Sequence, residues 1–400
     1  MTEGRQAPQP RRLAGGFANG MARTLGVAAA LMIAACSTVV PKGPQAGPAA
    51  PPPPPPKVRS GALPEDQRDR VAILAPLSGP DAGVGESIAN AATMALIDSA
   101  ADRVRITTYD TGAGAGAAAR KALADGNRLI LGPLLAADVR QVAPIAAAAH
   151  VPVLSFSNDV DVAGHGVYLL GYAPTQSIDR VIDYAHSRGL TRIAALMPGG
   201  LYGRRASNAL LQAVQDAGSS VVSMQSYDRS PVSLTAAIRK LGPPTGYDAV
   251  LIADTGRIAV VAAPILRKAG SAARLLGTEL WNAEPQLASA KPMQGAWFAA
   301  VSDRLYAQFA AKYRARYGKP SYRLASLGYD AVLLTVRISA DWNPGTPFPE
   351  RRLTDKGGFA GVDGAFRFGE DGIAERRLDV KQIGAGGVTI VAPAAQGFDG

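Results

Sequence analysis

Cysteine and histidine are scarce in this sequence, and their scarcity excludes whole classes of site. The 400 residues include a single cysteine, Cys36, so no disulfide can form within one chain. The three histidines, His150, His165 and His186, are scattered, and with one cysteine they cannot complete a His/Cys zinc site. We therefore expect no metal centre, and no residue pattern calls for a cofactor.

Charged residues are also few, and the basic ones are not clustered. Only 18% of residues are charged, and 42 Lys and Arg against 32 Asp and Glu give a net charge of +10. The longest basic runs are pairs, such as Arg351–Arg352 and Arg376–Arg377, without interleaved aromatic residues. This distribution is typical of a solvated surface and gives no support to nucleic-acid binding.

The N-terminal region has no apolar run long enough to span a bilayer, but a short one ends at the cysteine. Arg23 precedes the apolar stretch from Leu25 to Ala35, which is followed directly by Cys36. Small residues at positions 34 and 35 suit a peptidase groove, and the thiol can accept an acyl chain. The segment resembles a bacterial lipoprotein signal, and a plain signal peptide with a lone cysteine is the alternative. We expect residues 1–35 to be removed and Cys36 to be lipidated.

Prolines are concentrated directly after this cysteine. Nine of them lie between Pro41 and Pro56, six in an unbroken run. Polyproline II rises by about 3.1 Å per residue, so residues 36–64 predict a spacer on the order of 60–80 Å long. A ligand for a proline-binding domain is the alternative. By resemblance to bacterial lipoproteins, Ser37 after the cysteine implies that the protein is located on the periplasmic side of the outer membrane. The lipid anchor would be its contact with the membrane.

Residues 65–400 alternate short aliphatic runs with amphipathic helical patterns. In 134–149, for example, apolar residues recur at steps of three and four. Alternation of this kind predicts an α/β fold of parallel sheets with helices on both faces. The pattern occurs twice, so we expect two doubly wound lobes. The strand candidates are 71–75, 104–109, 128–131, 151–156 and 167–170, then 192–197, 221–225, 248–253, 274–277 and 296–299.

Polar residues follow several of these strands, where open parallel sheets bind ligands. Two lobes that face each other with these strand ends would form a cleft suited to a small polar ligand. Asp254 and Glu279 have two possible roles, binding of a ligand amine or capping of a helix N-terminus, and the sequence does not decide between them. The candidate ligand-binding residues are Ser78, Gly79, Ser155, Ser157, Asn158, Tyr202, Asp254 and Glu279.

Other constellations favour structural roles. The segment Thr111–Ala117 matches a dinucleotide-binding glycine pattern, but the next strand ends without the acidic residue that pattern needs, which favours a plain turn. Asp159 and Asp161 are interpreted as solvated loop acids. No serine lies in a nucleophile elbow, and no histidine has a recognisable partner, so we expect no enzyme.

The order of these signals resembles the type I periplasmic binding proteins, the leucine/isoleucine/valine-binding group. The resemblance implies three crossovers between the lobes. It places lobe one at about 70–172 and 295–341 and lobe two at about 173–294 and 355–395, with the helix after Tyr329 in lobe one and the last strands in lobe two. The landmarks that carry it are 71–80 with its Ser-Gly-Pro turn, Tyr109-Asp110, Gly132-Pro133, 151–155, Tyr202-Gly203, 329–331 and 359–368.

Ligand residues carry over from that family unevenly. Hydroxyl groups are expected after the third strand to hold an α-carboxylate, but Leu134, Leu135 and Ala136 stand there. Tyr202 and Glu279 match the tyrosine and the amine-binding acid of the second lobe. An ordinary amino acid is therefore a poor ligand. The segment 154–158 also resembles lipid-anchored activators of penicillin-binding proteins, although the helical-repeat domain of the best-known activators is missing.

Two functions remain open at this point. The first is a non-enzymatic regulator, an anchored activator whose partner is a peptidoglycan synthase, that is, a penicillin-binding protein. The alternative is the substrate-binding component of an amino-acid ABC transporter, whose partner is an ABC permease. An anchor and a spacer favour the first, because a transporter component must reach the permease in the other membrane.

Overall fold

The computed structural model describes residue 64 and residues 67–398. The expected signal peptide, Cys36 and nearly all of the proline-rich spacer lie outside the described residues, so these expectations remain predictions. Within residues 67–398, no helix combines the length and the apolar character that crossing a bilayer requires.

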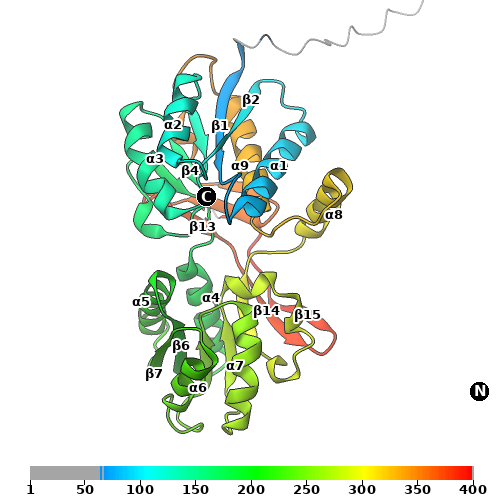
Figure 1. The fold of residues 1–400 in the computed structure, drawn as a ribbon. Coiled ribbons are helices and arrows are strands. Elements are labelled where there is room, and N and C mark those ends of the chain that lie inside the picture. The colour runs from blue at the N-terminus through cyan, green and yellow to red at the C-terminus, as the bar shows by residue number, and fades with distance from the viewer. Residues whose placement is uncertain (1–63, 65–66, 399–400) are drawn as a thin grey trace, which may run out of the picture. The chain divides into compact units, whose positions relative to one another are not determined.

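Lobe one is built on a five-stranded parallel sheet with the order β2-β1-β3-β4-β5. Its strands are β1 (Asp69–Ala75), β2 (Val104–Asp110), β3 (Leu129–Leu131), β4 (Val153–Ser155) and β5 (Val167–Leu169). Side chains alternate between the two faces of β1, so Val71 and Ile73 face one core while Ala72 and Leu74 face the other. Both faces are therefore covered, the first by α1 (Ala82–Asp98) and α9 (Ala325–Ser339), the second by α2 (Ala115–Ala124) and α3 (Ala136–Ala148) (Figure 1).

Lobe two is built on a seven-stranded sheet with the order β15-β14-β10-β9-β8-β6-β7. The parallel strands are β6 (Arg192–Pro198), β7 (Ser220–Tyr227), β8 (Ala249–Ile252), β9 (Arg274–Gly277) and β10 (Trp297–Ala300). β14 (Asp379–Gly384) and β15 (Gly387–Ala392) are added antiparallel at one edge. Helices α4 (Pro174–Ser187) and α5 (Leu201–Asp216) cover one face, and α6 (Pro231–Arg239) and α7 (Gly256–Lys268) cover the other.

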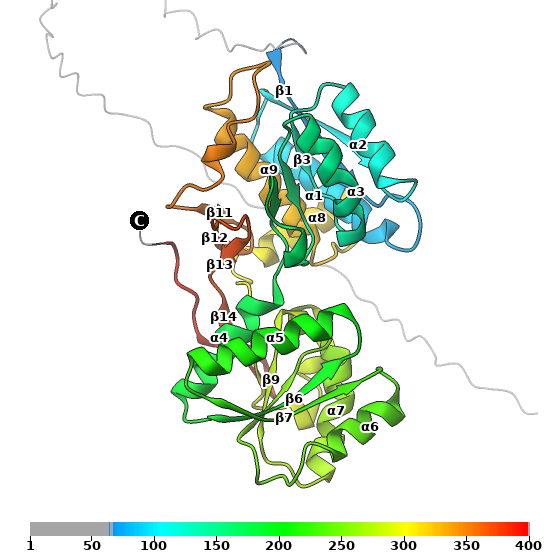
Figure 2. The ribbon, with the colours of Figure 1, turned by 90° about the vertical axis from the view of Figure 1, so that its left-hand side faces the viewer.

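The chain crosses between the lobes three times, after β5, after β10 and after β13 (Ala374–Arg376) (Figure 2). Between the second and third crossovers lie α8 (Tyr306–Tyr317), α9, β11 (Phe359–Gly361) and β12 (Gly364–Phe368). Short 3-10 helices fill the remaining connections: η2 (Val160–Val162), η3 (Glu279–Ala283), η4 (Pro285–Leu287), η5 (Lys291–Met293) and η6 (Glu350–Arg352). The predicted fold class, two doubly wound lobes joined by three crossovers, is confirmed.

The expected lobe boundaries were wrong in two places. Residues 297–300 were assigned to lobe one, but β10 pairs with β9 and β14 and so belongs to lobe two. Residues 359–376 were assigned to lobe two, but the hairpin strands β11 to β13 pack Phe359, Phe366 and Phe368 into the core of lobe one. Helix α8 was not anticipated. It packs Phe309 and Tyr313 against α1 of lobe one.

A buried ionic cluster joins the crossover segments. Asp363, which is fully buried, accepts hydrogen bonds from Arg323 Nη1 at 2.5 Å, from Ser326 Oγ at 2.7 Å and from the Tyr172 hydroxyl. Tyr172 belongs to the first crossover and Arg323 lies just before α9. Because a buried carboxylate without partners is costly, this cluster fixes the relative positions of the segments that meet there.

Candidate ligand-binding site

The serines that follow β4 shape a loop at the carboxyl edge of the lobe-one sheet. Ser155 Oγ donates to the carbonyl of Pro133 at 2.9 Å and accepts from Ser157 N at 3.0 Å. Ser157 Oγ in turn accepts from Asp159 N at 3.1 Å. Ser155 and Ser157 are both buried, whereas the next residue, Asn158, is exposed. The hydroxyl groups of this loop are thus used largely to hold its own backbone.

A cavity of about 260 Å³ lies in front of this loop, with walls from both lobes. Lobe one contributes the segments at the start of α3 and after β4, and lobe two contributes the first turns of α4 and α5. Three of the eight predicted ligand residues, Ser157, Asn158 and Tyr202, line it. The remaining walls are Leu134, Leu135, Ala136, Asp159, Pro174, Leu201 and Arg205.

Arg205 links the two lobes across this cavity. Its guanidinium pairs with Asp159 and, at 2.7 Å, with Asp161, while Arg140 pairs with Asp159 at 2.9 Å. Burial opposes the charge on Arg205, but the two carboxylates outweigh it and raise its pKa. The interpretation of both acids as solvated was therefore wrong for Asp159, which is buried; Asp161 remains 65% exposed.

Tyr202 and Glu279 form a second polar group beside the cavity. The Tyr202 hydroxyl donates to Glu279 Oε1 at 3.0 Å, and Ser177 Oγ donates to Glu279 Oε2. Burial raises the pKa of Glu279, although the hydrogen bonds from Ser177 and Tyr202 act against it. Burial and the nearby Glu279 charge raise the pKa of Tyr202 well above its usual value. Glu279 does not line the cavity itself. Its carboxylate lies behind Tyr202, which lines the cavity and donates a hydrogen bond to it.

Asp254 lies in a separate buried cluster. Its Oδ2 accepts from the Tyr227 hydroxyl and from Arg229 Nε, each at 2.8 Å. Its Oδ1 accepts from the neighbouring Thr255 N at 2.7 Å. Thr255, one residue later, is the cap of α7, so Asp254 is neither the helix cap nor a cavity residue.

Ser78 and Gly79 form the turn after β1 and do not reach the cavity between the lobes. Asp110 Oδ1 holds this turn by accepting from Leu77 N at 2.8 Å and Ser78 N at 3.3 Å. Gly112 is required here because a Cβ would lie 2.5 Å from the Ser78 carbonyl oxygen. The glycine-rich segment after β2 thus serves the close approach of two loops, in agreement with its interpretation as a turn.

Arg205 was the residue that sequence reasoning missed. It stands three positions after Tyr202 in the first turns of α5, and residues at this spacing share one face of a helix. That spacing, directly after a strand that ends at the cleft, was the available signal. That the eight predicted residues together bind a ligand remains a prediction.

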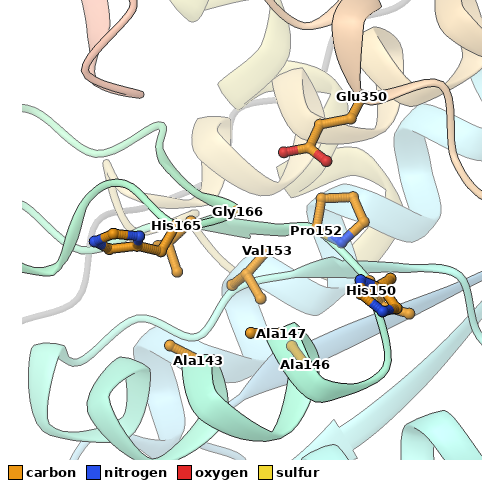
Figure 3. A pocket seen from close by; sticks show the side chains of 11 residues that line it. Ala143, Ala146, Ala147, His150, Pro152, Val153, His165, Gly166 and Glu350 are labelled. Carbon is orange, nitrogen blue, oxygen red and sulfur yellow. The ribbon is translucent and has the colours of Figure 1, made fainter.

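A further cavity of about 230 Å³ lies elsewhere in lobe one and shares no lining residue with the first (Figure 3). His150 and His165 line it, both with positive φ angles, together with Glu350, whose Oε1 accepts from the Tyr168 hydroxyl at 2.8 Å. In the part of the chain that the structure describes, no three His, Cys, Asp or Glu side chains are grouped to hold a metal.

Two doubly wound lobes, three crossovers and a cavity between the lobes define the type I periplasmic binding fold. Solved structures agree. A putative branched-chain amino acid ABC transporter protein from Rhodospirillum rubrum matches with a TM-score of 0.70 and 21% identity over 81% of this chain and 100% of that one. A leucine binding protein from Thermotoga maritima matches with a TM-score of 0.62 and 19% identity over 82% and 98%.

A solute binding protein from Rhodopseudomonas palustris BisB5, solved with 3,4-dihydroxybenzoic acid, matches with a TM-score of 0.65 and 16% identity over 84% and 98% of the two chains. Among curated proteins, the "Uncharacterized protein RP748" of Rickettsia prowazekii is 27% identical over 179 residues, 44% of this chain and 48% of that protein. The chain thus spans about half the length of the curated relative it matches.

Residues 70–387 match the family described as "Periplasmic binding protein", and the chain belongs to that family. The family implies a periplasmic location and a ligand-binding protein. Several of the structural relatives are described as solute-binding or substrate-binding proteins of transporters.

Proposed function

We propose that this protein binds a small organic carboxylate between its lobes and serves as the solute-binding component of an ABC transporter. The observation that carries the proposal is Arg205, a guanidinium in the wall of the cavity. Its Nε has no hydrogen-bond partner among the described residues. The relatives support a transporter role, since a Streptococcus pneumoniae relative is a branched-chain amino acid transporter protein solved with isoleucine, and a Rhodopseudomonas palustris relative holds benzoate.

A ligand carboxylate can reach Arg205 by replacing Asp161. Asp161 is 65% exposed, so water can replace Arg205 as its partner, and losing this contact costs little. A carboxylate on an arginine, by contrast, forms short charge-assisted hydrogen bonds, often two at once. Asp159 stays in place, because Arg140 also holds it and its side chain is buried.

The walls favour an apolar ligand body. Leu134, Leu135, Leu201 and Pro174 line much of the cavity. Asn158 and the Tyr202 side chain are the polar neighbours that could orient the ligand. The volume of about 260 Å³ lies just below the range of roughly 300–1,000 Å³ that is usual for ligand sites, which restricts the ligand to a small molecule.

An α-amino group would gain little here. The carboxylate of Glu279 already accepts from Ser177 and Tyr202 and does not line the cavity. The segment 134–136 also supplies no hydroxyl donor for an α-carboxylate. Two missing charge-assisted hydrogen bonds correspond to roughly 3–6 kcal/mol, or about a hundred- to ten-thousand-fold in affinity.

Calorimetry with purified protein tests this proposal. We expect benzoate or 4-methylpentanoate to bind, and Arg205→Gln to weaken that binding at least about tenfold because the cation is lost. Asp161→Asn should strengthen it severalfold by freeing Arg205. Arg204→Gln is the matched control, since Arg204 lies in the same helical turn but does not line the cavity.

Leucine, isoleucine and valine separate this proposal from an amino-acid site. We expect none of them to bind in the cleft below about 100 μM, for the reasons given above. Submicromolar binding of any of them that is lost in Tyr202→Ala or Glu279→Ala would replace the carboxylate proposal with an amino-acid site.

A second candidate function is the regulator of a peptidoglycan synthase, anchored at the outer membrane. What favours it is that the charged groups around the cavity pair with one another, as Arg205 does with Asp159 and Asp161. The lipoprotein-like Cys36 and the proline-rich spacer add to it. Crosslinking followed by capture of membrane partners distinguishes the two. Recovery of a penicillin-binding protein together with failure of all carboxylates to bind would favour the regulator, and recovery of a permease would favour the transporter.

A further inference from the structure

A cavity of about 270 Å³ lies where the second and third crossovers meet, apart from the cleft cavity and sharing no lining residue with it. Lobe one contributes β11, β12 and the turn between them, and lobe two contributes β15. We call this space the hinge pocket. Its lining residues include Ser302, Arg304, Leu305, Val362, Arg377, Asp379, Ile390 and the segment 393–396.

The C-terminal segment 393–398 closes one side of the hinge pocket by returning from β15 toward β11 and β12 (Figure 2). Its backbone is fixed at Ala394, whose N–H donates to Asp379 Oδ1 at 2.7 Å. Its last described residue, Phe398, lies under the guanidinium groups of Arg367 and Arg377, at 4.7 and 4.6 Å from its ring centre. The segment 393–398 is therefore held near its start, at Ala394, and at its end, at Phe398.

Two charged side chains that line the hinge pocket each have an atom without a hydrogen-bond partner among the described residues. Asp379 is buried, and its Oδ2 has no partner among the described residues. Arg377 Nε is likewise buried and unpartnered. A buried polar group without a partner costs roughly 1–3 kcal/mol, more when it is charged, so a molecule that supplies both an acceptor and a donor would be stabilised here.

The rest of the lining is mainly apolar or cationic. Leu305 and Ile390 are large apolar side chains with 48% and 47% of their surface exposed, and Val362 lies between β11 and β12. Arg304 is exposed in the second crossover, and no carboxylate of the described residues pairs with it. The pocket thus offers an apolar surface beside two guanidinium groups and one carboxylate.

We propose that the hinge pocket binds a small zwitterion with an apolar side group. Its carboxylate accepts from Arg377 and Arg304, its ammonium group donates to Asp379, and its side group covers Leu305 and Ile390. A simple anion would leave Asp379 Oδ2 without a partner, and a simple amine would leave Arg377 Nε without one, so the complementary charges select a molecule that carries both.

Phenylalanine is a suitable probe, with 3-phenylpropanoate lacking its ammonium group and 2-phenylethylamine lacking its carboxylate. The titrations are run on the Arg205→Gln protein, in which the cleft cation is absent, so that failure in the hinge pocket and failure in the cleft are distinguishable. We expect phenylalanine to bind with Kd values in the range of about 0.1–10 mM and at least about tenfold more tightly than either analogue.

Variants locate the binding. Asp379→Asn and Arg377→Gln should each weaken phenylalanine binding about tenfold or more, and the exposed Arg304→Gln should weaken it without affecting folding. Arg314→Gln is the matched control, because Arg314 is an exposed arginine of α8 that neither lines the pocket nor contacts Phe398. Equal affinity for the three probes, no binding of phenylalanine at about 20 mM, or binding that Arg304→Gln and Asp379→Asn leave unchanged would each overturn the proposal.

Discussion

Asp69, the first residue of β1, carries a carboxyl group that the fold buries without a hydrogen-bond partner among the described residues. The side chain is 2% exposed, and neither carboxylate oxygen has a hydrogen-bond partner among the described residues. Burial raises the pKa of Asp69 to about 6, with the charge of Arg103 acting in the opposite direction. The folded protein therefore holds a proton that the unfolded chain releases near pH 4.

This raised pKa makes stability depend on pH in a defined direction. Between about pH 4 and 6 the folded state binds more protons than the unfolded state, so stability falls as the pH rises and stays lower above pH 6. Asp69→Asn resembles the protonated form and should be more stable than the wild type at pH 8, by on the order of 3 kcal/mol, with little difference at pH 4. Urea denaturation at both pH values measures this difference.

The exposed Asp102→Asn is the control for this prediction and should change stability equally little at both pH values. A gain in Asp69→Asn that is the same at pH 4 and pH 8 would show that the carboxyl group does not titrate as described.

Individual side chains were also the level at which the sequence was least informative. Tyr202 lines the cavity because it follows the end of β6, and its role in ligand binding stays a prediction. Asp254 follows a strand in the same way, yet its carboxylate accepts hydrogen bonds from Tyr227 at the end of β7 and from Arg229 in the loop after β7. The spacing from Tyr202 could have indicated Arg205, but its pairing with Asp159 depends on the folded position of α5. The end of a strand can be predicted from the residues around it, but the hydrogen-bond and ion-pair partners of a charged side chain come from distant segments of the chain.

At the level of elements, the packing of α1 against α9 depends on a glycine. Gly328 lies in α9, and a Cβ there would lie 2.5 Å from the carbonyl oxygen of Ile88 in α1. The two helices can approach so closely only because this position has no side chain. The contact belongs to the larger core of lobe one, which also holds Leu327 and Ala331.

Gly328→Ala should therefore push the two helices apart and destabilise the protein by about 1–3 kcal/mol. Gly116→Ala in α2 is the matched control. Its added methyl group would meet Ile145 at an ordinary 3.5 Å, and alanine favours a helix by up to about 1 kcal/mol over glycine. Denaturation of both variants checks the prediction, which fails if Gly328→Ala is as stable as Gly116→Ala.

The sequence predicted the elements better than their assembly. The ten strand candidates of the two parallel sheets lie within two residues of β1 to β10, because buried aliphatic runs are a local signal. Helix α8 was missed, since its buried face is aromatic and interrupted by charged residues. β10 was found but assigned to the wrong lobe, because its pairing with β9 and β14 is not encoded in its own residues.

For the molecule as a whole, the family and the fold followed from the order of landmarks, and the anchor remains a prediction. Cys36→Ser should abolish acylation and leave an unprocessed precursor, because the thiol is the expected acyl acceptor. Palmitate labelling and fractionation of membranes measure this. Normal labelling of the variant would end the lipoprotein interpretation. A substitution at Ser37 that keeps labelling but shifts the protein between membranes would support the expected outer-membrane location.

The crossovers also determine the order in which the parts of the lobe-one core are synthesised. The core of lobe one joins residues 71–170 to residues 327–374. At about 5–20 residues per second, a ribosome needs roughly 10–40 s to add residues 171–374, which complete this core. During that interval the sheet of β1 to β5 lacks α9 and the aromatic hairpin that cover one of its faces. A chain that folds while it is being synthesised therefore exposes the apolar face of this sheet until residues 325–374 have been added.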